Sequence, residues 1–203
     1  MHMPSHSLGR SEFGNPENKG KTISSDEAIQ LLNDWVKNDR LRLHMRQVAH
    51  LMKSWAKEKE QLDETDQWRW ELAGLLHDAD WDQWPDQHCS LIIAELEKRN
   101  VDPEVIHAIA SHGPSYFGVE PVSSMDKMLY AFDELSGFLH AYSLMRPNGY
   151  EGMEVKGVLK RMKDKSFAAN VSREDIRDAA SRSGLSMEEL IQFAIAHQSR
   201  FTG

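Results

Sequence analysis

From Ser24 onward the apolar residues recur at intervals of three and four, and this spacing constrains the fold more than any other feature. In the stretch of about 40–59, Leu41, Met45 and Val48 fall on one face of a helix. No segment alternates between polar and apolar residues with a period of two, as a half-buried strand would. The sequence therefore predicts an all-α protein, a helical bundle.

Capping signals and prolines set the predicted helix boundaries. Capping-box spacing marks helix starts after Ser24, Ser172 and Ser186, where Glu or Asp follows three residues later. Pro103 opens one helix at its first turn, and Pro147 ends the longest. The predicted helices cover about 24–38, 40–59, 66–78, 89–99, 103–112 and 123–145, with a loop over 79–88 and three further helical segments in the C-terminal third.

The chain divides into a polar leader and one domain. Residues 1–22 are rich in Ser, Gly, Pro, Asn and His and show no apolar period, which predicts a disordered tail or an added leader sequence. Residues 23–203 are long enough for one domain with a sizeable core. We expect a core over about 40–146 and a C-terminal helical extension over about 150–200.

Composition excludes several classes of protein. The net charge is −8 and the isoelectric point is near 5.7, so we expect no stable nucleic-acid binding, which usually requires a basic surface. Cys89 is the single cysteine, which excludes an intramolecular disulfide. No apolar stretch resembles a signal peptide or a membrane span. These features predict a cytoplasmic protein that does not bind membranes.

Polar residues with metal-binding side chains interrupt the apolar pattern at three places. His77 and Asp78 follow the apolar run 72–76, where core residues would be expected. His44 lies on the apolar face of the predicted helix 40–59, and Asp133 lies at the edge of the apolar stripe of helix 123–145. Because three segments direct these groups inward, they can converge on one cation.

Helical projection separates candidate ligands from their neighbours. In the helix 103–112, His112 lies on the apolar side, whereas His107 lies nearly opposite and is expected to face solvent or a loop. In the long helix, Glu134 is expected on the solvent side, in contrast to Asp133. A buried Asp133 requires a proton, a core Arg or a metal as its partner.

The donor set indicates which metals could bind. Imidazoles and carboxylates suit Mn, Fe, Co, Ni or Zn, and Mg remains a further candidate. The chain has no set of thiolates for a structural zinc site. We therefore expect one or two divalent ions as cofactor.

At this point the residues carry a family resemblance. The ordered set of His44, His77-Asp78 and Asp133 resembles the HD superfamily of metal-dependent phosphohydrolases, and the chain resembles small bacterial HDIG-type proteins over about 40–180. The resemblance implies two more ligands, His88 and His112, and thus a site of six ligands for as many as two metals. The Ile-Gly pair that names the HDIG branch is replaced here by 79–80.

The resemblance also implies a reaction. A divalent ion lowers the pKa of its water to about 7, so that the water can attack a phosphoester at neutral pH. Asp78 would bridge two metals and act catalytically. Asp80 or Asp82, a turn beyond the ligands, could act as general acid or base, with Asp80 as the first candidate, although a solvated loop carboxylate is the commoner case. The expected activity is a phosphohydrolase acting on a small phosphomonoester or phosphodiester, with a nucleotide as one candidate.

Cations in the C-terminal extension are candidates for binding the phosphate. Lys156, Lys160 and Lys163 recur at helical spacing, and Arg146 and Arg173 flank them in sequence. Such a stripe is more commonly a solvated helix face. Expected partners are a small phosphorylated substrate and, as an open alternative, a second copy of the chain.

Two other functions remain open at this point. One is a sensor that binds metal and nucleotide without hydrolysis, because the sequence shows no recognisable substrate pocket and lacks Ile-Gly after His77-Asp78. The other is a di-iron oxygenase on the same scaffold, which the six-ligand count would also allow.

Overall fold

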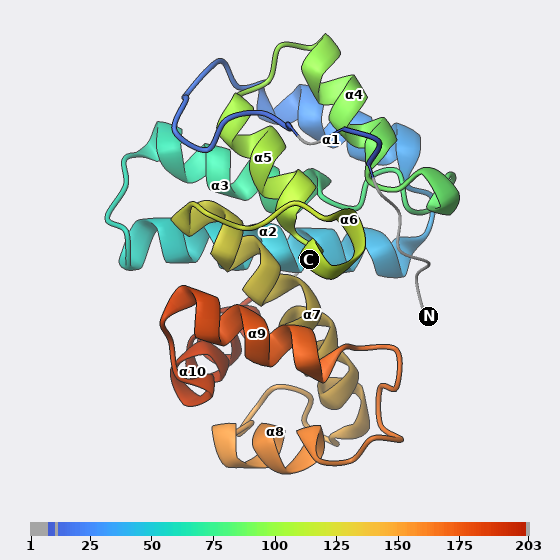
Figure 1. Ribbon diagram of the computed structural model, residues 1–203. Helices are drawn as coiled ribbons and strands as arrows, with labels where there is room; N and C mark the ends of the chain where they lie inside the picture. The colour runs from blue at the N-terminus through green and yellow to red at the C-terminus, as the bar shows by residue number, and fades with distance from the viewer. Residues whose placement is uncertain (1–7, 11, 202–203) are drawn as a thin grey trace.

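The structure is a computed structural model that describes residues 8–10 and 12–201. Within these residues the regular secondary structure is all helical, with no strand, as the apolar spacing predicts (Figure 1). A short 3-10 helix covers Pro85–Gln87. The α-helices are α1 (Ser25–Trp35), α2 (Asp39–Glu58), α3 (Glu64–Leu76), α4 (Ser90–Lys98), α5 (Pro103–Ser111), α6 (Pro114–Phe117), α7 (Ser124–Met145), α8 (Val155–Met162), α9 (Arg173–Ser183) and α10 (Met187–Gln198).

The predicted caps determine where these helices begin. Ser24 and Ser186 each form a complete capping box with the glutamate three residues later. Ser172 accepts a hydrogen bond from the backbone N–H of Asp175 and caps α9. The predicted helix boundaries agree within a few residues, and α6 is a short helix that the sequence analysis did not predict.

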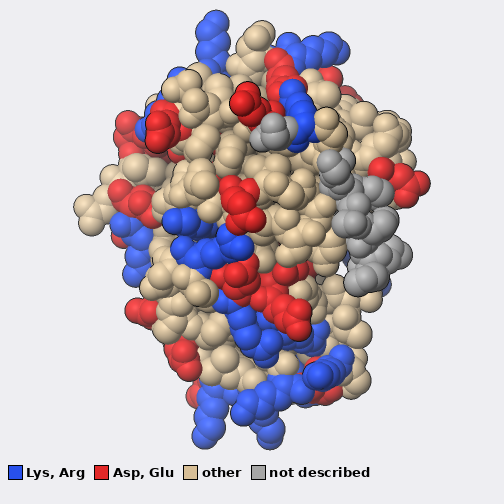
Figure 2. Space-filling model, viewed as in Figure 1, with Lys and Arg blue, Asp and Glu red and all other residues tan. Residues whose placement is uncertain are grey.

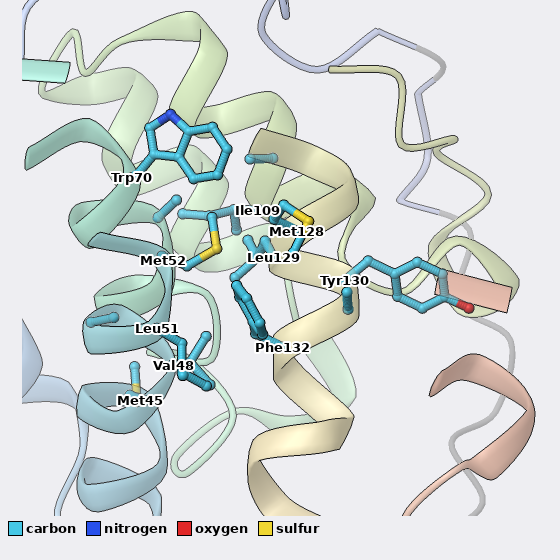
Figure 3. Close-up of a cluster of buried hydrophobic side chains, with 14 of the residues drawn as sticks. Met45, Val48, Leu51, Met52, Trp70, Ile109, Met128, Leu129, Tyr130 and Phe132 are labelled. Carbon is cyan, nitrogen blue, oxygen red and sulfur yellow. The ribbon is translucent and has the colours of Figure 1, made fainter. Parts of the chain in front are cut away.

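The core lies where α2, α3, α5 and α7 meet. Met45, Val48 and Met52 of α2 face Leu129 and Phe132 of α7 across the interior (Figure 3), and all five are buried. α7 continues past this core and packs against α8, α9 and α10 (Figure 1). One long helix thus connects the first half of the domain with the C-terminal extension.

The close approach of α2 and α3 depends on one glycine. A Cβ atom added to Gly74 would lie 2.7 Å from Cα of Ala49 and 2.8 Å from its backbone N. Any larger residue in α3 would therefore push α2 away. This packing sets the position of the residues that follow α3.

The described part of the N-terminal segment is packed on the domain, in contrast to the tail that its composition predicts. Phe13 is 3% exposed, and the backbone N–H of Asn15 donates to the carbonyl of Pro103 over 3.0 Å. Asp102 accepts a hydrogen bond from Gly20 over 2.8 Å. One buried aromatic side chain and a few backbone hydrogen bonds hold this segment, and neither produces a helical or strand period.

None of the described helices combines the length and the apolar character that crossing a bilayer requires.

Candidate metal centre

Six side chains from separate elements converge at the centre of the domain. His44 comes from α2 and Asp133 from α7, while His77 and Asp78 follow the last residue of α3. The turns after the 3-10 helix and after α5 supply the remaining two. Together they are the six predicted ligands: His44, His77, Asp78, His88, His112 and Asp133.

Four of these residues form a first group. Nε2 of His44 lies 3.0 Å from Oδ1 of Asp133. Nε2 of His77 lies 3.4 Å from the same oxygen and 3.4 Å from Oδ2 of Asp78. Their ligand atoms all lie within 4.8 Å of one another, close enough to surround one cation.

Asp78 also belongs to a second group, with His88 and His112. Its other oxygen, Oδ1, lies 3.3 Å from Nε2 of His88 and 3.6 Å from Nε2 of His112. The two oxygens of one carboxylate therefore face two different sets of ligands. This is the arrangement of a bridging carboxylate.

Hydrogen bonds fix the orientation of three imidazoles. Nδ1 of His77 donates to the carbonyl of Gly74 over 2.8 Å, and Nδ1 of His112 donates to the carbonyl of Ile109 over 2.6 Å. Nδ1 of His88 donates to Oδ1 of Asp80 over 2.6 Å. In the neutral form of each imidazole Nδ1 therefore carries the one proton, and Nε2 presents a lone pair to the centre.

Two buried nitrogen atoms lack any other partner. Nε2 of His77 and Nε2 of His88 are fully buried and accept or donate no hydrogen bond within the described part of the chain. A buried polar atom without a partner is unfavourable by about 1–3 kcal/mol. A cation coordinated by these nitrogens removes that cost, so the residues present fit a divalent metal.

The electrostatics of the group favour a cation as well. Burial raises the pKa of Asp78, yet the charge of His77 and the hydrogen bond from His112 lower it well below its ordinary value. Burial lowers the pKa of His77, yet Asp78 and Asp133 raise it well above its ordinary value. The carboxylates are thus ionised, and protons on the imidazole are what a metal would displace.

Asp80 is not placed as the sequence analysis expected. Instead of facing a substrate as a general acid or base, it is completely buried, with one oxygen bonded to His88 and the other accepting from the backbone N–H of Ile92 over 2.9 Å. The turn after α3 directs it inward beneath the centre. Asp80 therefore orients the ring of His88 and does not line the cavity above the group.

A cavity of about 250 Å³ opens above the first group. Trp81 and Tyr116 line it, and Asn170 and Val171 from the segment before α9 complete its wall. Two neighbouring aromatic residues, Trp84 and Phe117, do not line the cavity. Trp84 lies edge-on to Trp35, and Phe117 packs against the rings of His88 and His112.

Glu134 also lines this cavity, although the sequence analysis expected it on the solvent side of its helix. The start of α9 covers that face of α7, and the backbone N–H of Ser172 donates to Oε2 of Glu134 over 3.0 Å. Burial and the neighbouring charge of Asp133 raise the pKa of Glu134 to about 8. Helical projection from α7 alone missed it, because the covering element comes from a distant part of the chain.

The predicted phosphate-binding cations lie outside this cavity. Arg146 donates to the carbonyls of Gly149 and Glu151, while Lys156 and Lys160 are exposed on α8. Their spacing indicates a solvated helix face, as a stripe of lysines usually does. Lys163 and Arg173 line a separate, neighbouring cavity.

Arg173, which lines this separate cavity, also has a structural role. Its guanidinium donates to the carbonyls of Ala168 over 2.6 Å and Val171 over 2.7 Å, and also to that of Phe167. It stacks on the ring of Phe138, 5.1 Å from the ring centroid. Arg173 thus holds the segment 164–171 that forms one wall of the cavity.

His107 lies outside the centre, but it faces α7 and not solvent or a loop, and its side chain is only 13% exposed. Its Nδ1 donates to Oδ2 of Asp126 over 2.9 Å. Asp126 also accepts from the backbone N–H groups of Val122 and Ser123 at the start of α7. The pair connects α5 to α7.

Comparison with known families gives one match. The family described as the HD domain matches residues 42–137, a range that contains all six side chains of the centre. The C-terminal extension lies outside the matched range. Comparison with curated proteins and with solved structures finds no match.

Proposed function

Because residues 42–137 form an HD domain, a family generally made of metal-dependent hydrolases, we propose that this protein is a divalent-metal-dependent phosphohydrolase. Its substrate would be a small phosphomonoester or phosphodiester, with a nucleotide as one candidate. The observation that supports this most is the shared carboxylate of Asp78, which faces two ligand groups at the floor of an open cavity. Paired ligand groups of this kind suit in-line displacement at phosphorus.

The residues of the centre fit one or two ions. The first would be held by His44, His77, Asp78 and Asp133, and the second by Asp78, His88 and His112. Bound divalent ions supply an acidified water molecule and neutralise charge on the phosphoryl oxygens.

Other side chains of the cavity would bind and orient the substrate. Trp81 and Tyr116 offer apolar and aromatic surface on one side, where an organic leaving group can pack. Glu134 belongs to neither ligand group, although it lines the same cavity. Its carboxyl is therefore the best-placed group to hold a proton for the leaving oxygen, the role first assigned to Asp80.

The proposal is tested by hydrolysis assays with the purified protein. Loaded with Mn, Co, Ni or Mg, the wild type should hydrolyse generic phosphoesters or a member of a nucleotide panel. His77→Ala and Asp78→Ala should abolish this activity, whereas Asp86→Ala, which removes an exposed carboxylate from the nearby turn, should retain it. The proposal is refuted if the metal-loaded wild type hydrolyses no phosphoester, or if its hydrolysis persists in His77→Ala and Asp78→Ala. Tight nucleotide binding without turnover would favour a sensor instead.

A further inference from the structure

A second cavity, of about 570 Å³, lies between the end of α8 and the start of α9. Lys163, Lys165 and Arg177 line it, together with Glu174. Val171 is part of its wall and also part of the wall of the metal cavity, the cavity above the first ligand group. The two cavities are thus neighbours that share one side chain.

The cations of this second cavity have no carboxylate partner. Among the described residues, no Asp or Glu oxygen lies within 4.0 Å of the side-chain nitrogens of Lys163, Lys165 or Arg177. Other arginines of the same region are paired, for example Arg161 with Asp164 and Arg182 with Asp178.

The wall of the second cavity therefore carries excess positive charge. Glu174 is its one carboxylate, against four cations: Arg173, whose guanidinium donates to backbone carbonyls, and three others that have no acidic partner. In a chain with a net charge of −8, three such cations around one hollow are a local exception. Figure 2 shows Lys and Arg side chains gathered toward the lower end of the molecule, where α8 lies. The ligand that would neutralise this positive charge is an anion.

The metal cavity above the first ligand group has no Lys or Arg in its wall within the described ranges 8–10 and 12–201. Its volume of about 250 Å³ is below the roughly 300–1,000 Å³ that is common for sites of small organic ligands. A substrate larger than its phosphoester group must extend out of this cavity, and Val171 marks the side on which unpaired cations are available.

We propose that the second cavity binds a phosphate group of the substrate that is not the one hydrolysed. This inference rests on the proposed function and narrows its substrate class to small molecules with two separated phosphate groups, such as a nucleoside bisphosphate. The phosphoester to be cleaved lies at the metal centre. The second phosphate lies beyond Val171, against Lys163, Lys165 and Arg177.

The subsite is tested first by binding alone, without turnover. Pyrophosphate is titrated calorimetrically into metal-free protein, in which the acidic centre attracts no anion. The wild type should bind it, and the double variant Lys163→Ala/Lys165→Ala should bind about tenfold more weakly, the loss expected for two partly exposed ion pairs. The matched control Lys156→Ala/Lys160→Ala removes the same charge from α8, just before these residues in sequence and outside the cavity, and should bind as the wild type does.

A catalytic comparison then separates a substrate subsite from an independent anion site. With metal, the wild type should show a higher kcat/KM for adenosine 3′,5′-bisphosphate than for adenosine 5′-phosphate. In Lys163→Ala/Lys165→Ala the ratio of the two kcat/KM values should fall about tenfold. In Lys156→Ala/Lys160→Ala the ratio should stay as in the wild type.

The outcomes distinguish the two proposals. No pyrophosphate binding by the wild type, or equal weakening in both double variants, overturns the subsite. Binding that depends on the cavity, combined with no preference for the bisphosphate, overturns its role in the substrate. Failure to hydrolyse any phosphoester, with cavity-dependent binding intact, refutes the phosphohydrolase proposal and leaves an anion site.

Discussion

Nδ1 of His88 lies 2.6 Å from Oδ1 of Asp80, and both side chains are buried at the candidate metal centre. This hydrogen bond fixes the ring so that Nε2 faces Asp78. Asp80→Asn should therefore weaken divalent-metal binding about 10–100-fold, because an amide oxygen is a poorer acceptor and holds the imidazole less firmly. Isothermal titration with Mn or Zn would measure the change.

The matched control for this prediction is Asp82→Asn. Asp82 accepts hydrogen bonds from the backbone N–H groups of Lys37 and Asn38 and contacts no ligand of the centre. Asp82→Asn removes the same negative charge as Asp80→Asn, from the same turn. Equal metal affinities of the Asp80 and Asp82 variants would contradict the role assigned to Asp80.

Gly74 is the residue at which packing and metal binding are most directly connected. Gly74→Ala should lower the free energy of unfolding by about 1–3 kcal/mol, because the new Cβ atom would overlap the backbone of Ala49. It should also weaken metal binding, because the carbonyl of Gly74 orients His77. Denaturant unfolding and metal titration check the two effects.

Gly137 provides the control for that substitution. It lies within α7, and a Cβ atom added there meets no heavy atom within 4 Å. Gly137→Ala should raise the free energy of unfolding by about 0.5–1 kcal/mol, the usual gain for alanine in a helix. A stable Gly74→Ala variant with normal metal affinity would show that the α2–α3 contact can relax.

The pair of Asp126 and His107 predicts a pH dependence of stability. Burial raises the pKa of Asp126, but the hydrogen bond and charge of His107 and two backbone N–H groups lower it below its ordinary value of 3.8. A carboxyl whose folded pKa is lowered stabilises the fold above its unfolded pKa, and this stabilisation disappears as the pH falls through the folded pKa. Asp126→Asn should therefore cost about 1–2 kcal/mol at pH 7, and the difference should shrink below about pH 3.8.

This dependence is measured by denaturant unfolding of metal-free protein between pH 7 and pH 3. Asp39→Asn removes an exposed carboxylate from the first turn of α2 and should change stability by less than about 0.5 kcal/mol. A cost of Asp126→Asn that is independent of pH would assign the effect to packing in place of charge.

Arg173 predicts a local change in mobility. Arg173→Lys should lower the free energy of unfolding by about 2 kcal/mol, because a lysine cannot reach the several carbonyls that the guanidinium binds. Amide hydrogen exchange over 164–171 should accelerate by more than exchange in the core helices. Arg177→Lys, an exposed neighbour, should change neither quantity. Unchanged exchange in Arg173→Lys would mean that other contacts hold the segment.

The parts of the centre that sequence could predict are those set by one helix at a time. His44 and Asp133 were identified because each interrupts the apolar face of its own helix, and the structure brings both to the centre. His88 follows no periodic pattern, so only the resemblance to a family indicated it. Its position depends on the turn after α3 and on Asp80, whose inward direction no helical period encodes.

Contacts between distant segments account for what the sequence analysis did not find. Glu134 is on the outer face of α7 as seen from the core, and it is covered only because α9 packs there. Phe13 belongs to the buried core, although its neighbours in sequence are polar. Likewise, the regular spacing of Lys156 and Lys160 does not reveal that both side chains lie outside the two cavities.

Asp78 faces the first ligand group with Oδ2 and the second with Oδ1. This one carboxylate carries a single negative charge and has one orientation. An ion bound by either ligand group therefore changes the charge and the orientation that Asp78 offers to the other group. Loading of the two groups is consequently a linked equilibrium with a coupling free energy, and the affinity measured for a second equivalent of metal reports on the first.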